Sequence, residues 1–216
     1  MSQNNQAGQC LICFNDLNKS PSLYHLYYHA TLCFHCLNQF SIYNRTHDYH
    51  GYKLTILYYY NDFFKQLLFQ YKGQGDYALK DAFLNAYPHF KTKYRRHLIA
   101  LVPSSQQDDL RRGFNPNEMI VRSFSNHIFT GLYKNSAYKQ TSQTDRSQVS
   151  QIIKIKDGQR LYNQNVIIFD DVITSGNTIM TCAKVISSYQ PKTISIIVMA
   201  CLLYTSDAAD DSLRVD

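Results

Sequence analysis

The segment Val166-Ile-Ile-Phe-Asp-Asp-Val-Ile-Thr-Ser-Gly-Asn-Thr178 decides the fold expected for this chain. Its four leading apolar residues, Val166–Phe169, predict a strand buried on both faces. A helix is predicted over Thr178–Ser188, and Pro191-Lys192 then turns the chain into a last predicted strand, Thr193–Ala200. Strand, helix and strand at these lengths predict a βαβ unit in a parallel sheet.

The loop between this strand and this helix has the chemistry of a phosphate site. A helix N-terminus offers unpaired backbone N–H groups and a partial positive charge, and both favour a phosphate. Gly176 lets the backbone approach closely, and hydroxyl donors lie around it at Thr174, Ser175 and Thr178. Asp170 and Asp171 end the strand, where α/β sheets place ligands, and suit ribose hydroxyls or a Mg²⁺-bound ligand. The simpler alternative is an acidic cap that begins an ordinary helix.

The whole string resembles the signature of type I phosphoribosyltransferases, which bind phosphoribosyl pyrophosphate (PRPP). A Walker A loop is excluded, because the required Gly-Lys pair is missing. The resemblance implies that Asp170 and Asp171 hold the ribose, and that the 5-phosphate is held by the loop residues Thr174, Ser175, Gly176, Asn177 and Thr178. Leu98–Val102, before Pro103, predicts a second buried strand. The expected fold class is therefore α/β, a type I phosphoribosyltransferase-like parallel sheet flanked by helices.

Four cysteines near the N-terminus form two pairs, Cys10-x-x-Cys13 and Cys33-x-x-Cys36. Four thiolates at this spacing suit a closed tetrahedral site for structural zinc, as in a zinc ribbon. Buried cysteines and redox pairs are the alternatives, but neither readily explains two pairs in so short a segment. Three nearby histidines offer substitute ligands: His25, His29 and His35. We expect a small zinc-ribbon-like module that needs its metal to fold.

Composition changes along the chain predict four regions. They are the zinc-ribbon-like module over residues 1–45, a helical linker or hood over 46–96, a phosphoribosyltransferase-like domain over 97–200, and a tail over 201–216. In the second region, helices are predicted over Leu57–Lys72 and around Tyr77–Tyr87. In the third, Met119–Leu132 predicts a helix and the polar stretch Tyr133–Gly158 a mobile loop.

The tail starts with an abrupt change from an apolar strand to an acidic, alanine-rich sequence. Cys201-Leu-Leu-Tyr-Thr-Ser-Asp-Ala-Ala-Asp-Asp211 resembles one translated frame of a sequencing adapter, so residues 201–216 are expected to be non-native. A genuine, frayed C-terminus is the alternative.

Composition sets the broad class. The 216 residues are 44% hydrophobic, which excludes global disorder. The net charge of +6 suits a phosphate-bearing or polyanionic ligand, and the alternative is a solvated basic surface. The sequence shows no apolar run long enough to span a bilayer and no secretory signal at its start, so a cytoplasmic protein is expected.

Several motifs occur in a distinctive order. After the cysteine pairs come Tyr71-Lys-Gly-Gln-Gly-Asp76, Leu101-Val-Pro-Ser104, Arg111-Arg-Gly-Phe-Asn115, Gln143-Thr144 and the Asp-Asp loop. Over residues 8–200 this order resembles ComF-type competence proteins, the ComFC group. The resemblance implies a role in natural transformation, in which the protein handles incoming single-stranded DNA on the cytosolic side with a helicase-like ATPase.

The same resemblance implies contacts with pyrophosphate from Ser104, Ser105, Arg112 and Lys72. The alternatives are a solvated helix end for Lys72 and, for Arg112, a structural partner of the turn at Asn115. The stretch after Gln143-Thr144 matches the group only weakly, which leaves open what this loop does and whether any reaction occurs.

Three functions follow from these features. The first is a competence factor for DNA uptake that binds PRPP, possesses structural zinc and interacts with single-stranded DNA through basic charge and some of its 18 tyrosines. The second is an active phosphoribosyltransferase of nucleotide metabolism, working with Mg²⁺. The third is a zinc-dependent adaptor whose loop has lost its ligand.

Overall fold

The structure is a computed structural model that describes residues 8–17, 31–134 and 153–202. The larger elements are, in chain order, α2 (Phe34–Asn38), β1 (Ile42–Tyr49), β2 (Tyr52–Tyr59), α3 (Asp62–Gly73), η2 (Tyr77–Asp81), α4 (Phe90–Tyr94), β3 (Leu98–Leu101), α5 (Gln106–Arg112), α6 (Pro116–Arg122), β4 (Ile128–Phe129), β5 (Leu132–Lys134), β6 (Ile153–Ile155), η3 (Gly158–Leu161), β7 (Asn165–Ile173), α7 (Asn177–Ser187) and β8 (Thr193–Cys201). Most of the expected tail, and residues 135–152 of the expected mobile loop, lie outside the described residues.

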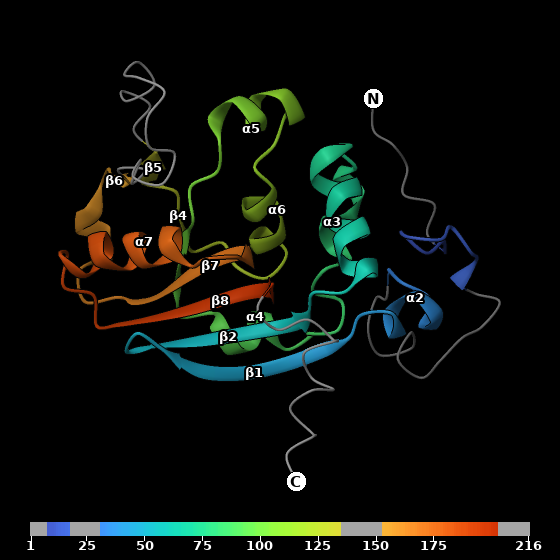
Figure 1. Cartoon of the computed structure of the whole chain (residues 1–216), viewed down its shortest axis with the longest axis horizontal. Coiled ribbons are helices and arrows are strands. Elements are labelled where there is room, and N and C mark those ends of the chain that lie inside the picture. Colours follow the sequence, from blue (N-terminus) through green and yellow to red (C-terminus); the bar gives the residue numbers. More distant parts are fainter. Residues whose placement is uncertain (1–7, 18–30, 135–152, 203–216) are drawn as a thin grey trace, which may run out of the picture.

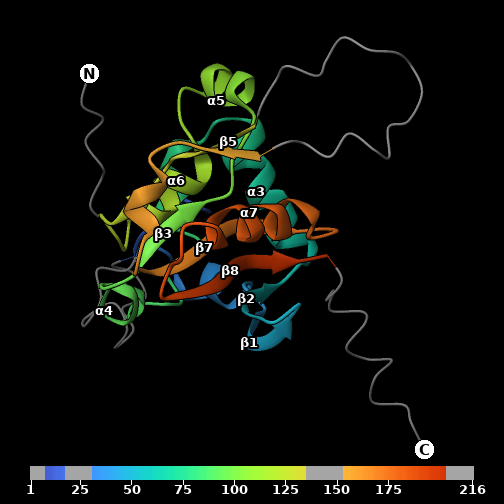
Figure 2. The same ribbon diagram turned by 90° about the vertical axis from the view of Figure 1, so that its left-hand side faces the viewer.

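Six strands form one mostly parallel sheet in the order β1-β2-β8-β7-β3-β4 (Figure 1). The five strands β2, β8, β7, β3 and β4 each run parallel to the next in this order, whereas β1 is antiparallel to β2. Strands β5 and β6 form a separate antiparallel pair. Figure 2 shows α7 lying over one face of the sheet, along β7 and β8. The α/β class is confirmed, and the sheet is mixed because the hairpin of β1 and β2 adds one antiparallel edge.

The sheet is buried on both faces, which explains its continuous apolar strands. Along β7, Ile167 and Phe169 belong to one hydrophobic cluster, and Val166 and Ile168 belong to another. Successive side chains of a strand point to opposite faces, so each cluster takes every second residue. The first cluster includes the four-cysteine region and α3, and the second includes the packing face of α7.

The predicted helix over Leu57–Lys72 begins later than expected. Leu57–Tyr59 belong to β2, and α3 starts at Asp62 after Asn61, whose side chain accepts a hydrogen bond from the Phe64 N–H at 2.9 Å. Apolar residues near a helix start do not distinguish helix from strand. Pairing with β8 places this stretch in the sheet, so part of the expected helical region 46–96 supplies two sheet strands.

Two of the other predicted helices are also shorter, whereas the one predicted over Thr178–Ser188 is confirmed as α7, Asn177–Ser187. The helix expected over Met119–Leu132 is α6, Pro116–Arg122, and the chain after it forms β4 and the start of β5. Asn115 caps α6 and Pro116 occupies its first turn, a start signal that the prediction did not use. The stretch Tyr77–Tyr87 forms only the 3₁₀ turn η2 before turns that lead to Pro88. Within the described residues, none of the helices is long and apolar enough to cross a membrane.

Candidate functional site

The predicted phosphate loop joins β7 to α7, as expected. Strand β7 continues to Ile173, beyond the predicted end at Phe169. Asp170 and Asp171 therefore lie in the C-terminal part of the strand rather than after it. Gly176 caps α7 with a left-handed φ of 74°, a conformation that costs an L-residue free energy. The backbone amides at the start of this 11-residue helix therefore face the loop.

A cavity of about 250 Å³ opens beside this loop. The structure brings eight of the eleven predicted ligand residues to its wall, namely Lys72, Ser104, Asp170, Asp171, Thr174, Ser175, Gly176 and Thr178. They come from α3, from the loop after β3, from β7, from the loop between β7 and α7, and from α7. Segments far apart in the sequence thus meet at the carboxyl ends of parallel strands, the usual ligand position in such sheets.

Three predicted residues do not line this cavity: Ser105, Arg112 and Asn177. Ser105 caps α5, and Asn177 is the exposed first residue of α7. Arg112 donates to Asp109 Oδ1 at 2.8 Å. The Asn115 side chain also donates to Asp109, at 2.9 Å, so Arg112 takes part in the network that supports the Asn115 turn.

Two polar cavity residues were missed by the sequence analysis, Asn117 on α6 and Lys134 at the end of β5. Asn117 is only 5% exposed and its Nδ2 donates to Asp170 Oδ1 at 3.0 Å. A single asparagine in a helix and a single lysine in a polar stretch have no spacing that marks them. Only the packing of α6 and β5 around the cavity identifies them.

The two adjacent carboxylates have different partners. Asp171 is 7% exposed and its Oδ2 forms an ion pair with Lys72 Nζ. Burial raises the pKa of Asp170 to about 6, and the charges of Lys72 and Lys134 and the Asn117 hydrogen bond act in the opposite direction. Asp170 is therefore ionised at neutral pH and becomes protonated in mild acid.

Lys72 lies in the last turn of α3, with 28% of its side chain exposed at the cavity. Burial lowers the pKa of Lys72 to about 8, although the Asp170 charge works against that shift. The ammonium is charged at neutral pH, and an anionic ligand would stabilise that form further. Lys72 and Lys134 give the cavity two cations, and the loop gives it amides and hydroxyls, a combination that suits a phosphorylated sugar.

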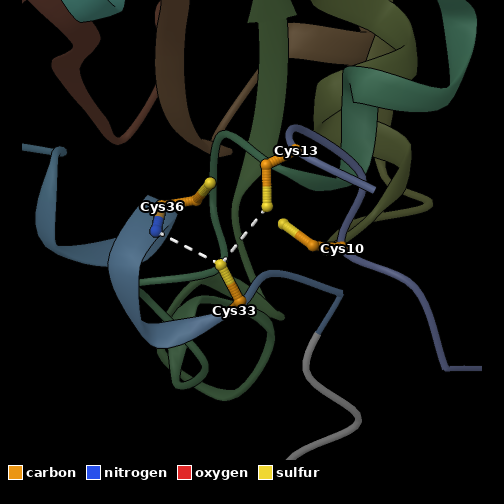
Figure 3. A group of neighbouring side chains, drawn as sticks. All are labelled: Cys10, Cys13, Cys33 and Cys36. Atoms are coloured by element: carbon orange, nitrogen blue, oxygen red, sulfur yellow. Dashed lines mark hydrogen bonds between the residues drawn. The ribbon is translucent and has the colours of Figure 1, made fainter. Parts of the chain in front are cut away.

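The four predicted metal ligands converge. The Sγ atoms of Cys10, Cys13, Cys33 and Cys36 all lie within 4.8 Å of one another, and those of Cys13 and Cys33 are 3.6 Å apart (Figure 3). Tetrahedral zinc with Zn–S bonds of about 2.3 Å needs sulfur atoms about 3.8 Å apart. Cysteine is also the ligand type that zinc takes in closed structural sites. The cluster therefore fits a tetrahedral metal ion.

Local structure holds this cluster in place. Cys33 caps α2, where its Sγ accepts from the Cys36 N–H at 3.5 Å, and the Phe14 N–H donates to Cys10 O at 2.9 Å. Although burial raises it, backbone hydrogen bonds from Cys13, Cys33 and Ile12 lower the pKa of the Cys10 thiol to about 7. A thiolate is the form that binds metal. The three histidines offered as substitutes are not needed for four ligands, and two of them, His25 and His29, lie outside the described residues.

The chain is similar to known proteins over part of its length. The model of the phosphoribosyl transferase domain family matches residues 110–213. Solved hypoxanthine phosphoribosyltransferases overlap the chain only in part. That of Staphylococcus aureus has a TM-score of 0.38 at 14% identity, over 59% of this chain and 65% of that one, and that of Trypanosoma cruzi 0.35 at 11% identity, over 59% and 68%.

The mixed, mostly parallel sheet and the family match make this chain similar to phosphoribosyl transferase domains over residues 110–213. Among curated proteins it is similar to competence protein ComFC of Bacillus subtilis (strain 168), at 25% identity over 134 residues. The match covers 59% of this chain and 55% of the relative, so the chain spans about half the length of that protein. With the four-cysteine cluster, these findings fit a ComFC-type protein.

Proposed function

We propose that this protein is a competence factor for DNA uptake in natural transformation, and that its cavity binds PRPP together with Mg²⁺. The observation that carries the proposal is the meeting of two carboxylates, a hydroxyl-rich loop, the N-terminus of α7 and two lysines on one cavity. The curated relative is named a competence protein, which supports the biological role.

Each part of the ligand has a matching group in the cavity. The 5-phosphate would lie on the loop at the N-terminus of α7, where Thr174, Ser175 and Thr178 offer hydroxyls. The ribose hydroxyls would donate to a carboxylate of β7. The diphosphate and the Mg²⁺ that it carries would lie toward Lys72 and Lys134, whose charges balance part of its negative charge.

The four cysteines would hold a structural zinc ion. They join two segments, residues 8–17 and 31–40, that contain few helical or strand hydrogen bonds of their own. A metal that binds the folded form alone contributes its binding free energy to folding. We propose the module boundary near residue 45, and the boundaries near 96 and 200, on the composition of the sequence.

Single-stranded DNA and a helicase-like ATPase are the proposed partners, with the protein acting on the cytosolic side. A net charge of +6 supports a polyanionic partner. Tyr77, Tyr133 and Tyr162 are at least 39% exposed and available for stacking on bases, whereas Tyr58, Tyr71 and Tyr94 are buried. A salt titration of oligonucleotide binding tests this role, since an affinity independent of salt would remove the electrostatic argument.

Calorimetry with PRPP and Mg²⁺ tests the ligand. We expect saturable binding that Thr178→Val weakens, because Thr178 lines the cavity, and that Thr181→Val leaves unchanged, because Thr181 lies one helical turn away and bonds back to Asn177 O at 2.8 Å. Absence of binding to the zinc-loaded protein would refute the proposal. Release of pyrophosphate when nucleobases are added would support the alternative, an active phosphoribosyltransferase.

A further inference from the structure

The two carboxylates of β7 differ in which oxygens are already occupied. Oδ1 of Asp170 accepts two hydrogen bonds, from Asn117 Nδ2 at 3.0 Å and from the Asp171 N–H at 3.0 Å. Within the described ranges, Oδ2 of Asp170 has no hydrogen-bond partner. Asp171 instead directs Oδ2 to the ammonium of Lys72. One carboxylate thus has an oxygen available, and its neighbour is engaged by a lysine.

Asn117 reaches Asp170 from a well-anchored position. It is the second residue of α6, whose start is capped by Asn115, with Oδ1 accepting from the Glu118 N–H at 2.9 Å. The preceding carbonyl, Pro116 O, accepts from the buried Tyr71 hydroxyl at 2.8 Å. Since Asn117 itself is 5% exposed, its side chain has little room to turn away.

The chemistry of Asn117 also fixes its orientation. Only the amide nitrogen donates, so contact with an ionised carboxylate requires Nδ2 to face Asp170. This orientation leaves Asn117 Oδ1 buried without a hydrogen-bond partner among the described residues. A buried unsatisfied acceptor lowers stability, and such groups are uncommon unless they have a role.

We propose that Asn117 is a positioning residue for ligand binding, which together with the Asp171 N–H occupies Oδ1 of Asp170 and leaves Oδ2 to accept a ribose hydroxyl, while Asp171 chiefly holds Lys72. This inference rests on the proposed phosphoribosyl ligand. It assigns different tasks to two adjacent carboxylates that the sequence presents as equivalent.

A change in the donor at Asn117 must alter how readily Asp170 takes up a proton. The charged groups that act on Asp170 come from three elements: Lys72 of α3, Lys134 of β5 and its neighbour Asp171 of β7. The Cys182 thiol of α7 is also within electrostatic reach, but burial raises its pKa to about 12, so it stays neutral. Substitution of Asn117 leaves all these groups in place and removes one donor to the ionised form, so the pKa of Asp170 must rise.

The test measures binding of ribose 5-phosphate to the zinc-loaded protein from pH 5 to 8, without added Mg²⁺. The substitution Asn117→Leu keeps the side-chain shape and removes the donor, and Asn117→Ser is a smaller, polar second variant should the first not fold. We expect affinity at pH 7 to fall about two- to tenfold, because the loss of one hydrogen bond to the charged form leaves a larger share of Asp170 protonated. We also expect the acidic limb of the profile to move to higher pH. The phosphate of the ligand titrates too, but identically for every variant.

Ser123→Ala is the matched control. It removes the hydrogen bond from the Ser123 hydroxyl to Ile120 O at the far end of α6, changes no charge and leaves the donor on Asp170 in place, so it should not move the acidic limb. A limb that moves equally in Ser123→Ala, or that stays fixed in both Asn117 variants, would overturn the inference.

A second measurement is independent of any ligand. The carboxyl carbon of Asp170, followed by NMR against pH, should titrate at higher pH in Asn117→Ser than in the unaltered protein. Equal titration midpoints would refute the role of Asn117. If ribose 5-phosphate fails to bind the unaltered protein at every pH, the proposed function fails, and a shift of this midpoint would still show that Asn117 controls Asp170.

Discussion

Replacement of Gly176 by alanine should damage both the stability of the protein and its ligand site. Gly176 caps α7 with φ 74°, where a Cβ costs about 1–2 kcal/mol. Alanine also restricts the unfolded chain more than glycine does, and this offsets about 0.4–1 kcal/mol of that cost. The new methyl group would also overlap the hydroxyl of Tyr49 and approach its Cζ to 3.0 Å.

Tyr49 can move only at a cost. It ends β1, stacks edge-on against His50 at 4.7 Å and packs against the hydrophobic cluster under α7. An off-rotamer ring costs about 0.5–1.5 kcal/mol. The sum is about 2 kcal/mol, which lowers the melting temperature of a chain of this size by about 4–8 °C.

A double-mutant cycle separates the two causes. Tyr49→Ala removes the obstructing ring, so Gly176→Ala should cost about 1 kcal/mol less in that background, as measured by urea unfolding. Ribose 5-phosphate affinity should fall at least about tenfold in Gly176→Ala, because the amides that precede α7 would be displaced. An unchanged melting temperature, or the same cost with and without Tyr49, would refute this account.

Three further predictions concern other parts of the molecule. Chelation of the metal should expose four reactive thiols and lower the unfolding temperature. Cys182 should stay unreactive, because it is buried and burial raises its pKa to about 12. A number of reactive thiols that chelation does not change would contradict the metal site. Ribose 5-phosphate affinity should fall as pH rises through about 8 and Lys72 loses its proton, and Lys72→Met should remove that basic limb. The stability of the free protein should change with pH in the opposite direction. Between pH 8 and about 10.5 Lys72 is protonated more in the unfolded state than in the folded state, so the free energy of unfolding should rise with pH, which urea titrations can check. Deletion of residues 203–216 should leave binding and melting temperature unchanged, whereas deletion from Cys201 should destabilise the protein, because Cys201 is buried in β8 and pairs with Tyr59 and Ile173.

The sequence by itself determined the elements whose signals are local. The run Val166–Phe169 is apolar because both its faces are buried, and the loop that follows carries the chemistry of a phosphate site within a few residues. The spacing of the four cysteines was enough to predict their cluster, since a Cys-x-x-Cys pair presents both sulfur atoms to one side.

Only the tertiary structure decided the features that depend on partners distant in the chain. The intrinsic preferences of Leu57–Tyr59 are too weak to decide between helix and strand. The pairing of β2 with β8 makes this stretch a strand. The cavity joins α3, α6, β5 and β7, so Asn117 and Lys134 became site residues and Arg112 became a partner of Asp109 only through the packing of those elements. The same packing gave Asp170 and Asp171, adjacent and chemically identical, different partners, because neighbouring residues of a strand point in opposite directions and meet different parts of the fold.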